Sequence, residues 1–168
     1  DILPEAGVQL TQSEIDAPST MYYVDANGEI QVLQDINAEV SQEWASFDEL
    51  PEDLIHAAVA IEDKRFFEHQ GVDWVTTIKA CARMFVGDGS MGGSTITQQM
   101  IKNYTNRNDV TVQRKVQEIF DATRCEKQYD KKMILEYYMN LIYLGEGQQG
   151  VKSAAAYYFG KELQMLTT

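Results

Sequence analysis

The sequence has few of the residues that build disulfide scaffolds, metal sites or membrane spans. It contains 2 cysteines, 2 histidines and 3 prolines in 168 residues. Two cysteines are too few for a disulfide framework, and the spacing of Cys81 and Cys125 fits no zinc pattern. No apolar run approaches the roughly 18 residues that cross a bilayer. Because neither an initiator Met nor a signal peptide begins the chain, we expect a fragment of a longer protein.

Basic residues are scarce in the first part of the chain. Residues 1–68 hold 16 acidic residues but only Lys64 and Arg65 as bases, whereas residues 69–168 hold 12 bases and 10 acids. The net charge of −12 argues against a nucleic-acid partner, since phosphate contacts need a basic surface. The bases are therefore concentrated in the second part, where a site for an anionic group is more plausible.

Periodicity predicts one mainly α domain with a small N-terminal β-hairpin. Residues 1–17 lack periodicity and are predicted to form a linker or tether, which leaves 18–168 as the domain. Two β-prone runs, Met21–Val24 and Glu29–Leu33, flank an Asn-Gly pair that favours a hairpin turn. The predicted helices, with their caps, run from Pro51 to Glu62, from Asp73 to Gly87, from Ser94 to Asn103, from Thr111 to Gln128, from Asp130 to Leu144, and from Gly150 to Tyr158.

A candidate base ends the first predicted helix, where an apolar run stops at Glu62. Leu54, Ala58 and Ile61 share one helical face in this prediction. Glu62 would border that face, where partial burial disfavours the charged form of a carboxylate, while Asp63 and Lys64 would turn toward water. The alternative is a helix that simply becomes polar at its end.

Two further stretches could bind an anion. Four glycines in residues 87–93 precede Ser94 and Thr95, and free N–H groups at such a helix start favour phosphate oxygens. This is no Walker loop, because Lys102 follows the hydroxyls by about two turns. Arg114 and Glu118 share a face of a later helix beside Lys115. The alternatives are an ordinary capped helix and a solvated basic face.

The joint order of these stretches is more specific than any of them. The chain contains Glu-Asp-x-x-Phe-x-x-His-x-Gly at 62–71, Gly-Ser-Thr-Ile-Thr-Gln-Gln at 93–99, Arg-Lys-x-x-Glu at 114–118 and Lys-x-Ile-Leu-Glu-x-Tyr-x-Asn at 132–140, then a Gly-Val to Gly-Lys stretch at 150–161. This order closely resembles the peptidoglycan glycosyltransferase domain of class A penicillin-binding proteins and of monofunctional glycosyltransferases.

The resemblance implies a lysozyme-like fold and polymerisation of lipid II, with inversion to a β-1,4 linkage and release of undecaprenyl diphosphate. It also implies a place on the extracytoplasmic face of the bacterial cell membrane, with an N-terminal transmembrane anchor that this chain lacks. The segment between the first two motifs would approach the membrane surface. The implied partners are lipid II, the growing glycan strand and moenomycin-type inhibitors, while a following transpeptidase domain stays open.

The resemblance also assigns roles to residues of this sequence. Glu62 is implied to be the base, and Glu118 a second essential carboxylate that orients basic groups or binds a divalent cation, Mg or Mn. The residues implied to bind the substrate or its diphosphate are Asp63, His69, Ser94, Thr95, Gln98, Gln99, Lys102, Asn103, Arg114 and Lys115. The residues implied to build the motifs are Phe66, Gly71, Gly93, Lys132, Glu136 and Asn140.

Two other functions compete with this interpretation. A lysozyme-like lytic muramidase would also use a helix-borne Glu, but it needs a protonated acid and has little use for a cationic cluster. A catalytically silent module that binds lipid-linked saccharide would need neither carboxylate. A diphosphate leaves without a proton, so a transferase needs one base and several cations, and the sequence contains both.

Overall fold

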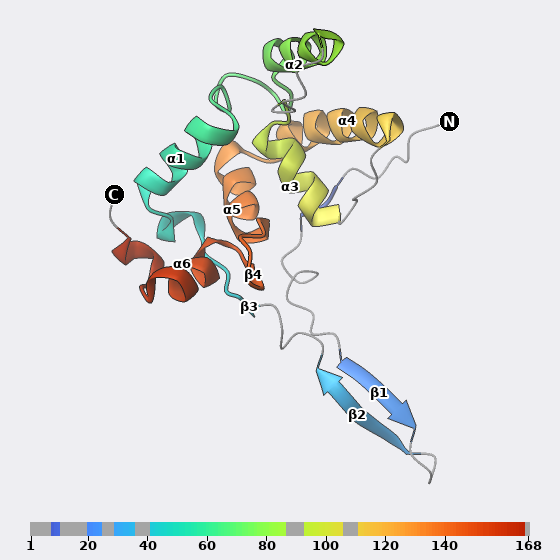
Figure 1. The fold of residues 1–168 in the computed structure, drawn as a ribbon, viewed down its shortest axis with the longest axis vertical. Coiled ribbons are helices and arrows are strands. Elements are labelled where there is room, and N and C mark those ends of the chain that lie inside the picture. The colour runs from blue at the N-terminus through green and yellow to red at the C-terminus, as the bar shows by residue number, and fades with distance from the viewer. Residues whose placement is uncertain are drawn as a thin grey trace.

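The computed structural model describes residues 8–10, 20–24, 29–35, 41–86, 93–105 and 111–166. Helices dominate these residues, which confirms the mainly α fold class (Figure 1). In Figure 1, α3, α4 and α5 form the centre of the helical body, α1 and α6 lie to one side, and α2 lies at the top. Among the described residues, no helix is both long enough and apolar enough to traverse a bilayer.

Helix α1, Glu52–Glu62, buries a different face from the one predicted. Ile55 and Val59 are buried, whereas Ile61 is 77% exposed. The buried positions recur every four residues, so Asp63, which follows the last helical residue, continues the same buried line. The predicted stripe is therefore wrong at Ile61, whereas Leu54 and Ala58 are partly buried against the core, beside the fully buried line.

Helices α2, Trp74–Val86, and α3, Ile96–Thr105, begin at side-chain caps. The predicted cap of α2 is confirmed, because Asp73 Oδ1 accepts hydrogen bonds from the amides of Val75 and Thr76 at 3.0 and 3.1 Å. The predicted cap of α3, Ser94, is wrong. Thr95 Oγ1 accepts from the Gln98 amide, and Gln98 Oε1 accepts from the Thr95 amide, so the two residues form a capping box.

Helices α4, Val112–Gln128, α5, Lys131–Leu141, and α6, Val151–Phe159, complete the body. Their starts lie close to the predicted ones, with Thr111 and Asp130 as N-caps. Helical spacing predicts an apolar face of α4 that consists of Val112, Val116, Ile119, Phe120 and Thr123. This prediction is wrong for Val116 and Phe120, which are exposed, whereas Ile119 packs against the core. The buried face of α4 consists instead of Glu118, Ala122 and Cys125. Burial, with the charges of Glu126 and Asp121, raises the pKa of the Cys125 thiol to about 12.

Two short strand pairs accompany the helices. β1, Thr20–Val24, pairs antiparallel with β2, Ile30–Asp35, away from the helical body in Figure 1. Residues 25–28 lie outside the described ranges, so their hairpin turn stays a prediction. β3, Ser41–Gln42, pairs in parallel with β4, Gln148–Gln149.

Helix α5 holds the segment before α1 through two side chains of the Lys-x-Ile-Leu-Glu motif. Glu136 accepts hydrogen bonds from the Trp44 indole at 3.0 Å and the Phe47 amide at 2.8 Å. Asn140 accepts from the Ala45 amide and donates to the Ala45 carbonyl, both at 2.8 Å. The Nζ atom of Lys132, from the same motif, lies 5.4 Å from the centre of the Phe47 ring. These contacts are structural, and none of the three residues lines the cavity described below.

Residues 8–10, within the predicted linker, lie against the helical body. Leu10 is buried, and its amide donates to the Tyr129 hydroxyl at 3.2 Å. The Tyr104 hydroxyl donates to the Gln9 carbonyl at 2.6 Å. The predicted linker therefore includes a short stretch that packs on the ends of α3 and α4.

Gly71 permits close packing of the loop after α1 against α4. Its φ is +83°, and a Cβ atom built there would lie 2.5 Å from the backbone of Ala122. Gly160 also has a positive φ, +60°, but a Cβ atom there would meet nothing within 4 Å. The two positions therefore separate the steric cost of a side chain from its conformational cost.

We expect Gly71→Ala to lower the free energy of unfolding by more than about 3 kcal/mol, because strain and overpacking add. Gly160→Ala should cost only about 1 kcal/mol, since it introduces conformational strain alone. Urea denaturation measures both values. Similar costs for the two variants would contradict the proposed contact between Gly71 and α4.

Candidate active site

A cavity of about 280 Å³ lies where the end of α1, the loop that follows it, and the starts of α2 and α3 meet. It brings together residues of the first two sequence motifs, which are about 30 positions apart. Its lining residues are Ile61, Glu62, Asp63, Lys64, Arg65, Asp73, Thr76, Gly93, Ser94 and Thr95.

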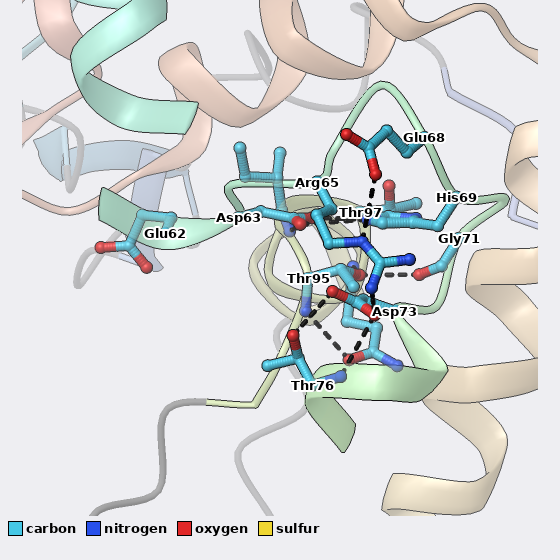
Figure 2. A network of polar contacts seen from close by, with 12 residues as sticks. Glu62, Asp63, Arg65, Glu68, His69, Gly71, Asp73, Thr76, Thr95 and Thr97 are labelled. Carbon is cyan, nitrogen blue, oxygen red and sulfur yellow. Dashed lines mark hydrogen bonds and ion pairs between the residues drawn. The ribbon is translucent and has the colours of Figure 1, made fainter. Parts of the chain in front are cut away.

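Glu62 is an exposed carboxylate on the wall of this cavity. The Gln99 amide of α3 donates to Glu62 Oε2 at 2.8 Å, which fixes the carboxylate relative to that helix. In Figure 2 the Glu62 carboxylate points away from the polar network around Asp63 and Arg65. The predicted partial burial of Glu62 is therefore wrong. Its exposed position beside Gln99 leaves the carboxylate accessible to a ligand.

Asp63 is the buried member of the carboxylate pair, with 3% of its side chain exposed. Its carboxylate lies 2.9 Å from His69 Nε2 and accepts from the Ile96 amide at 3.1 Å. The prediction that Asp63 turns toward water is wrong, because the side chain continues the buried line of α1. These contacts join the end of α1 to the start of α3. Asp63 also lines the cavity, and the predicted substrate contacts of Asp63 and His69 stay predictions.

Sequence reasoning missed a second network on the cavity wall. The Arg65 guanidinium lies 3.6 Å from Asp73 Oδ1 and 3.2 Å from Glu68 Oε2 (Figure 2). Burial alone would raise the pKa of Asp73, but hydrogen bonds from Thr76 and Val75 and the charge of Arg65 together lower it below its usual value. Asp73 was predicted only as a helix cap, and no sequence signal pointed to Arg65.

The start of α3 is attached to the loop after α1. Besides its part in the capping box, the Thr95 hydroxyl donates to the Gly71 carbonyl at 2.7 Å (Figure 2). Gly93 packs tightly on α2, since a Cβ atom built there would lie 2.8 Å from that of Ala80. Thr95 and Gln98 are thus engaged in internal hydrogen bonds that cap the helix, and anion binding at this helix start stays a prediction.

A cationic cluster adjoins the cavity from the side of α4. Both Arg114 and Lys115 form ion pairs with Glu118, of which 9% is exposed. Lys115 Nζ also donates to Ser94 Oγ at 2.7 Å and contacts Gln98 Oε1 at 3.3 Å. Because Ser94 lines the cavity, this hydrogen bond connects the cluster to the space that Glu62 faces.

The surroundings of Lys115 disfavour its charged form. Burial, then the positive charges of Arg114 and Lys102, lower the pKa of Lys115. Two buried donors nearby, Gln98 Nε2 and Arg114 Nε, have no hydrogen-bond partner within the described part of the chain. A negatively charged ligand would relieve the repulsion between the cations. Lys102 and Asn103 are exposed one turn beyond Gln98 and Gln99 on α3.

The residues present do not fit a divalent cation at Glu118. Its carboxylate is shared between Arg114 and Lys115, which would repel a metal ion. Within the ranges that the structure describes, no group of three or more His, Cys, Asp or Glu side chains could hold one. The chemistry below therefore uses only the side chains of the chain itself.

An accessible carboxylate in a cavity beside paired cations suits a transferase. The carboxylate can act as a base on the acceptor, and the cations can stabilise a leaving group that departs as an anion. Comparison with known proteins agrees with this class: residues 28–168 match the family described as Transglycosylase, and the chain belongs to that family. It is 39% identical over 148 residues to the monofunctional glycosyltransferases of Staphylococcus aureus strains Newman, COL and N315, with 88% of this chain and 54% of each relative aligned. The chain spans about half the length of these curated relatives.

The adjacent carboxylates should differ in their effect on stability. Asp63→Asn removes an acceptor that His69 and the Ile96 amide share, so we expect it to lower the free energy of unfolding by about 2 kcal/mol. Glu62→Gln, at an exposed position, should change it by less than about 0.5 kcal/mol. Urea denaturation of both variants tests this difference, and a reversed order would restore the sequence-based assignment of burial.

Proposed function

We propose that this chain is the catalytic domain of a peptidoglycan glycosyltransferase, spanning residues 18–168 with a lysozyme-like fold. It polymerises lipid II into β-1,4-linked glycan strands with inversion and releases undecaprenyl diphosphate. The family match and the glycosyltransferase relatives support this reaction. The observation that carries the proposal is the hydrogen bond from Lys115 to Ser94, because it connects the cation cluster with the cavity that Glu62 faces.

Glu62 acts as the base for the acceptor. The 4-hydroxyl of the acceptor sugar gives its proton to the Glu62 carboxylate while its oxygen attacks the anomeric carbon of the donor. The bond from that carbon to the diphosphate breaks, and its electron pair leaves with the diphosphate. The hydrogen bond from Gln99 orients the carboxylate without removing it from the cavity.

The cation cluster stabilises the departing diphosphate. Arg114 and Lys115 are held by the buried Glu118, and the exposed Lys102 adds positive charge near Lys115. Positioned cations aimed at developing negative charge are a large source of rate enhancement. Glu118 acts through these two side chains, since its carboxylate pairs with them. The same cluster binds moenomycin-type phosphoglycolipids.

A lytic muramidase is less compatible with this geometry. Its acid must stay protonated, which requires an apolar and buried setting. The Glu62 side chain is exposed, and its cavity contains the charged residues Lys64, Arg65 and Asp73. The cluster around Lys115 would also have no use in hydrolysis of an uncharged glycosidic bond.

The domain works at the extracytoplasmic face of the bacterial membrane. Helix α2 supports this placement, because Trp74 and Ile78 lie one turn apart and are 58% and 66% exposed. Val75 beside them is also exposed. An apolar helical face next to the cavity could rest on the lipid surface that presents the substrate.

Turnover by lipid II polymerisation tests the roles of the two carboxylates. Glu62→Gln should lower the rate by at least about 100-fold, because the amide has the same shape but cannot take a proton. It should leave binding of a moenomycin-type inhibitor unchanged. Glu118→Gln should weaken inhibitor binding as well, since Arg114 and Lys115 lose their partner. Retained turnover in Glu62→Gln would contradict the assignment of the base.

Sedimentation with anionic phospholipid vesicles tests the membrane face. Ile78→Gln should weaken binding about tenfold, because the lost burial of one large aliphatic side chain is worth that much. Phe159→Gln is the matched control, since Phe159 is 65% exposed on α6, at the opposite end of the helical body from α2 (Figure 1). If both substitutions weakened binding equally, α2 would have no special role.

A further inference from the structure

A buried carboxylate outside the cavity connects three segments that carry the site. Glu126 lies on the last turns of α4, and 3% of its side chain is exposed. Its Oε1 atom accepts a short hydrogen bond from the Thr97 hydroxyl, and its Oε2 atom accepts from Lys131 Nζ at 2.6 Å. None of these three residues lines the cavity, and the mechanism above does not use them.

Thr97 lies where a small shift would matter most. It is fully buried in the first turn of α3 and directly precedes Gln98 and Gln99. Gln98 contacts Lys115 on one side of the site, and Gln99 donates to Glu62 on the other. Because one turn of helix carries all three residues, a rotation at Thr97 moves the contacts to both the base and the cations.

Lys131 extends the connection to the loop after Glu62. Its Nζ atom lies 4.2 Å from the centre of the Phe66 ring, and Phe66 is fully buried four residues beyond Glu62. The Lys131 side chain is 23% exposed, and a partly buried ammonium over an aromatic face is a favourable contact. Glu126 therefore holds α3 through Thr97 and the Glu62 loop through Lys131 and Phe66.

We propose that Glu126 is a positioning residue that sets the geometry between the base and the cation cluster. Hydrogen bonds to a buried carboxylate are short and directional, so they restrict the rotation of α3 more than apolar packing does. The inference rests on the proposed function for its kinetic consequence, whereas its structural consequence is independent of any reaction.

Hydrogen–deuterium exchange of the chain tests the structural part. Thr97→Val keeps the shape of the side chain and removes the donor, and Glu126→Gln removes the charge. Both should raise exchange at amides 96–99 by about tenfold or more, because local opening of the first turn of α3 becomes easier. Thr105→Val is the matched control, since the Thr105 hydroxyl donates to the Ile101 carbonyl of the same helix at 2.8 Å. Unchanged exchange at residues 96–99 would overturn the inference.

Steady-state polymerisation tests the functional part. Thr97→Val should lower kcat about tenfold with little change in KM, because misplaced groups act on the chemical step. Thr97→Ser should restore kcat, and Thr105→Val should not alter it. In a Gln99→Ala background the effect of Thr97→Val should shrink to less than about twofold, since coupled residues are not additive. Full additivity would reduce Glu126 to a stability residue and overturn the proposal.

The two readouts separate the inference from the proposed function. If the unsubstituted chain fails to polymerise lipid II while exchange changes as expected, the proposed function is wrong and the link from Glu126 to α3 is supported. If the chain polymerises lipid II but Thr97→Val changes neither the exchange of amides 96–99 nor kcat, the proposed function is supported and the inference is wrong.

Discussion

The carboxylate of Asp63 is the contact on which the arrangement of the site depends. It ends the buried line of α1 and accepts hydrogen bonds from the Ile96 amide at the start of α3 and from His69 in the intervening loop. A buried carboxylate is stable only when such donors surround it. The neighbouring residue, Glu62, is thereby held at the cavity, within reach of Gln99.

In the cation cluster, too, a buried charge is stabilised by groups of opposite charge. Arg114 and Lys115 lie next to each other, so their charges repel, and Glu118 makes this proximity tolerable. Burial, and after it the charges of Arg114 and Lys102, still lower the pKa of Lys115. An incoming diphosphate would complete the compensation, so the strain in the free site favours the ligand that the proposed reaction releases.

Local sequence rules predicted the helices well and their buried faces poorly. The predicted caps at Asp73 and Asp130 are confirmed, because a cap depends on a few neighbouring residues. The predicted apolar stripe of α1 was wrong at Ile61, and that of α4 was wrong at Val116 and Phe120, because the faces depend on which helices pack together. Val116 and Phe120 are exposed while the charged Glu118 is buried, which no hydrophobic pattern could predict.

In the candidate site, too, the sequence identified residues but not their burial or their partners. The order of the motifs identified Glu62, Ser94, Lys115 and Glu118, whose contacts or exposure now place them around one cavity and its adjoining cluster. The motifs could not distinguish accessible residues from buried ones, so Asp63 and Glu62 were assigned each other's environment. Arg65 and Glu126 carried no recognisable signal, because the sequence does not show that a loop folds Arg65 onto Asp73 or that α4 brings Glu126 to Thr97 of α3.

Gln98 belongs at once to the fold and to the site. Its side chain closes the capping box with Thr95, contacts Lys115, and retains an unpartnered donor among the described residues. An exchange of this residue for a better substrate contact would weaken the start of α3, and a better cap would displace Lys115. A substitution of Gln98 therefore changes the start of α3 and the position of Lys115 together, so its effects on stability and on ligand binding are coupled.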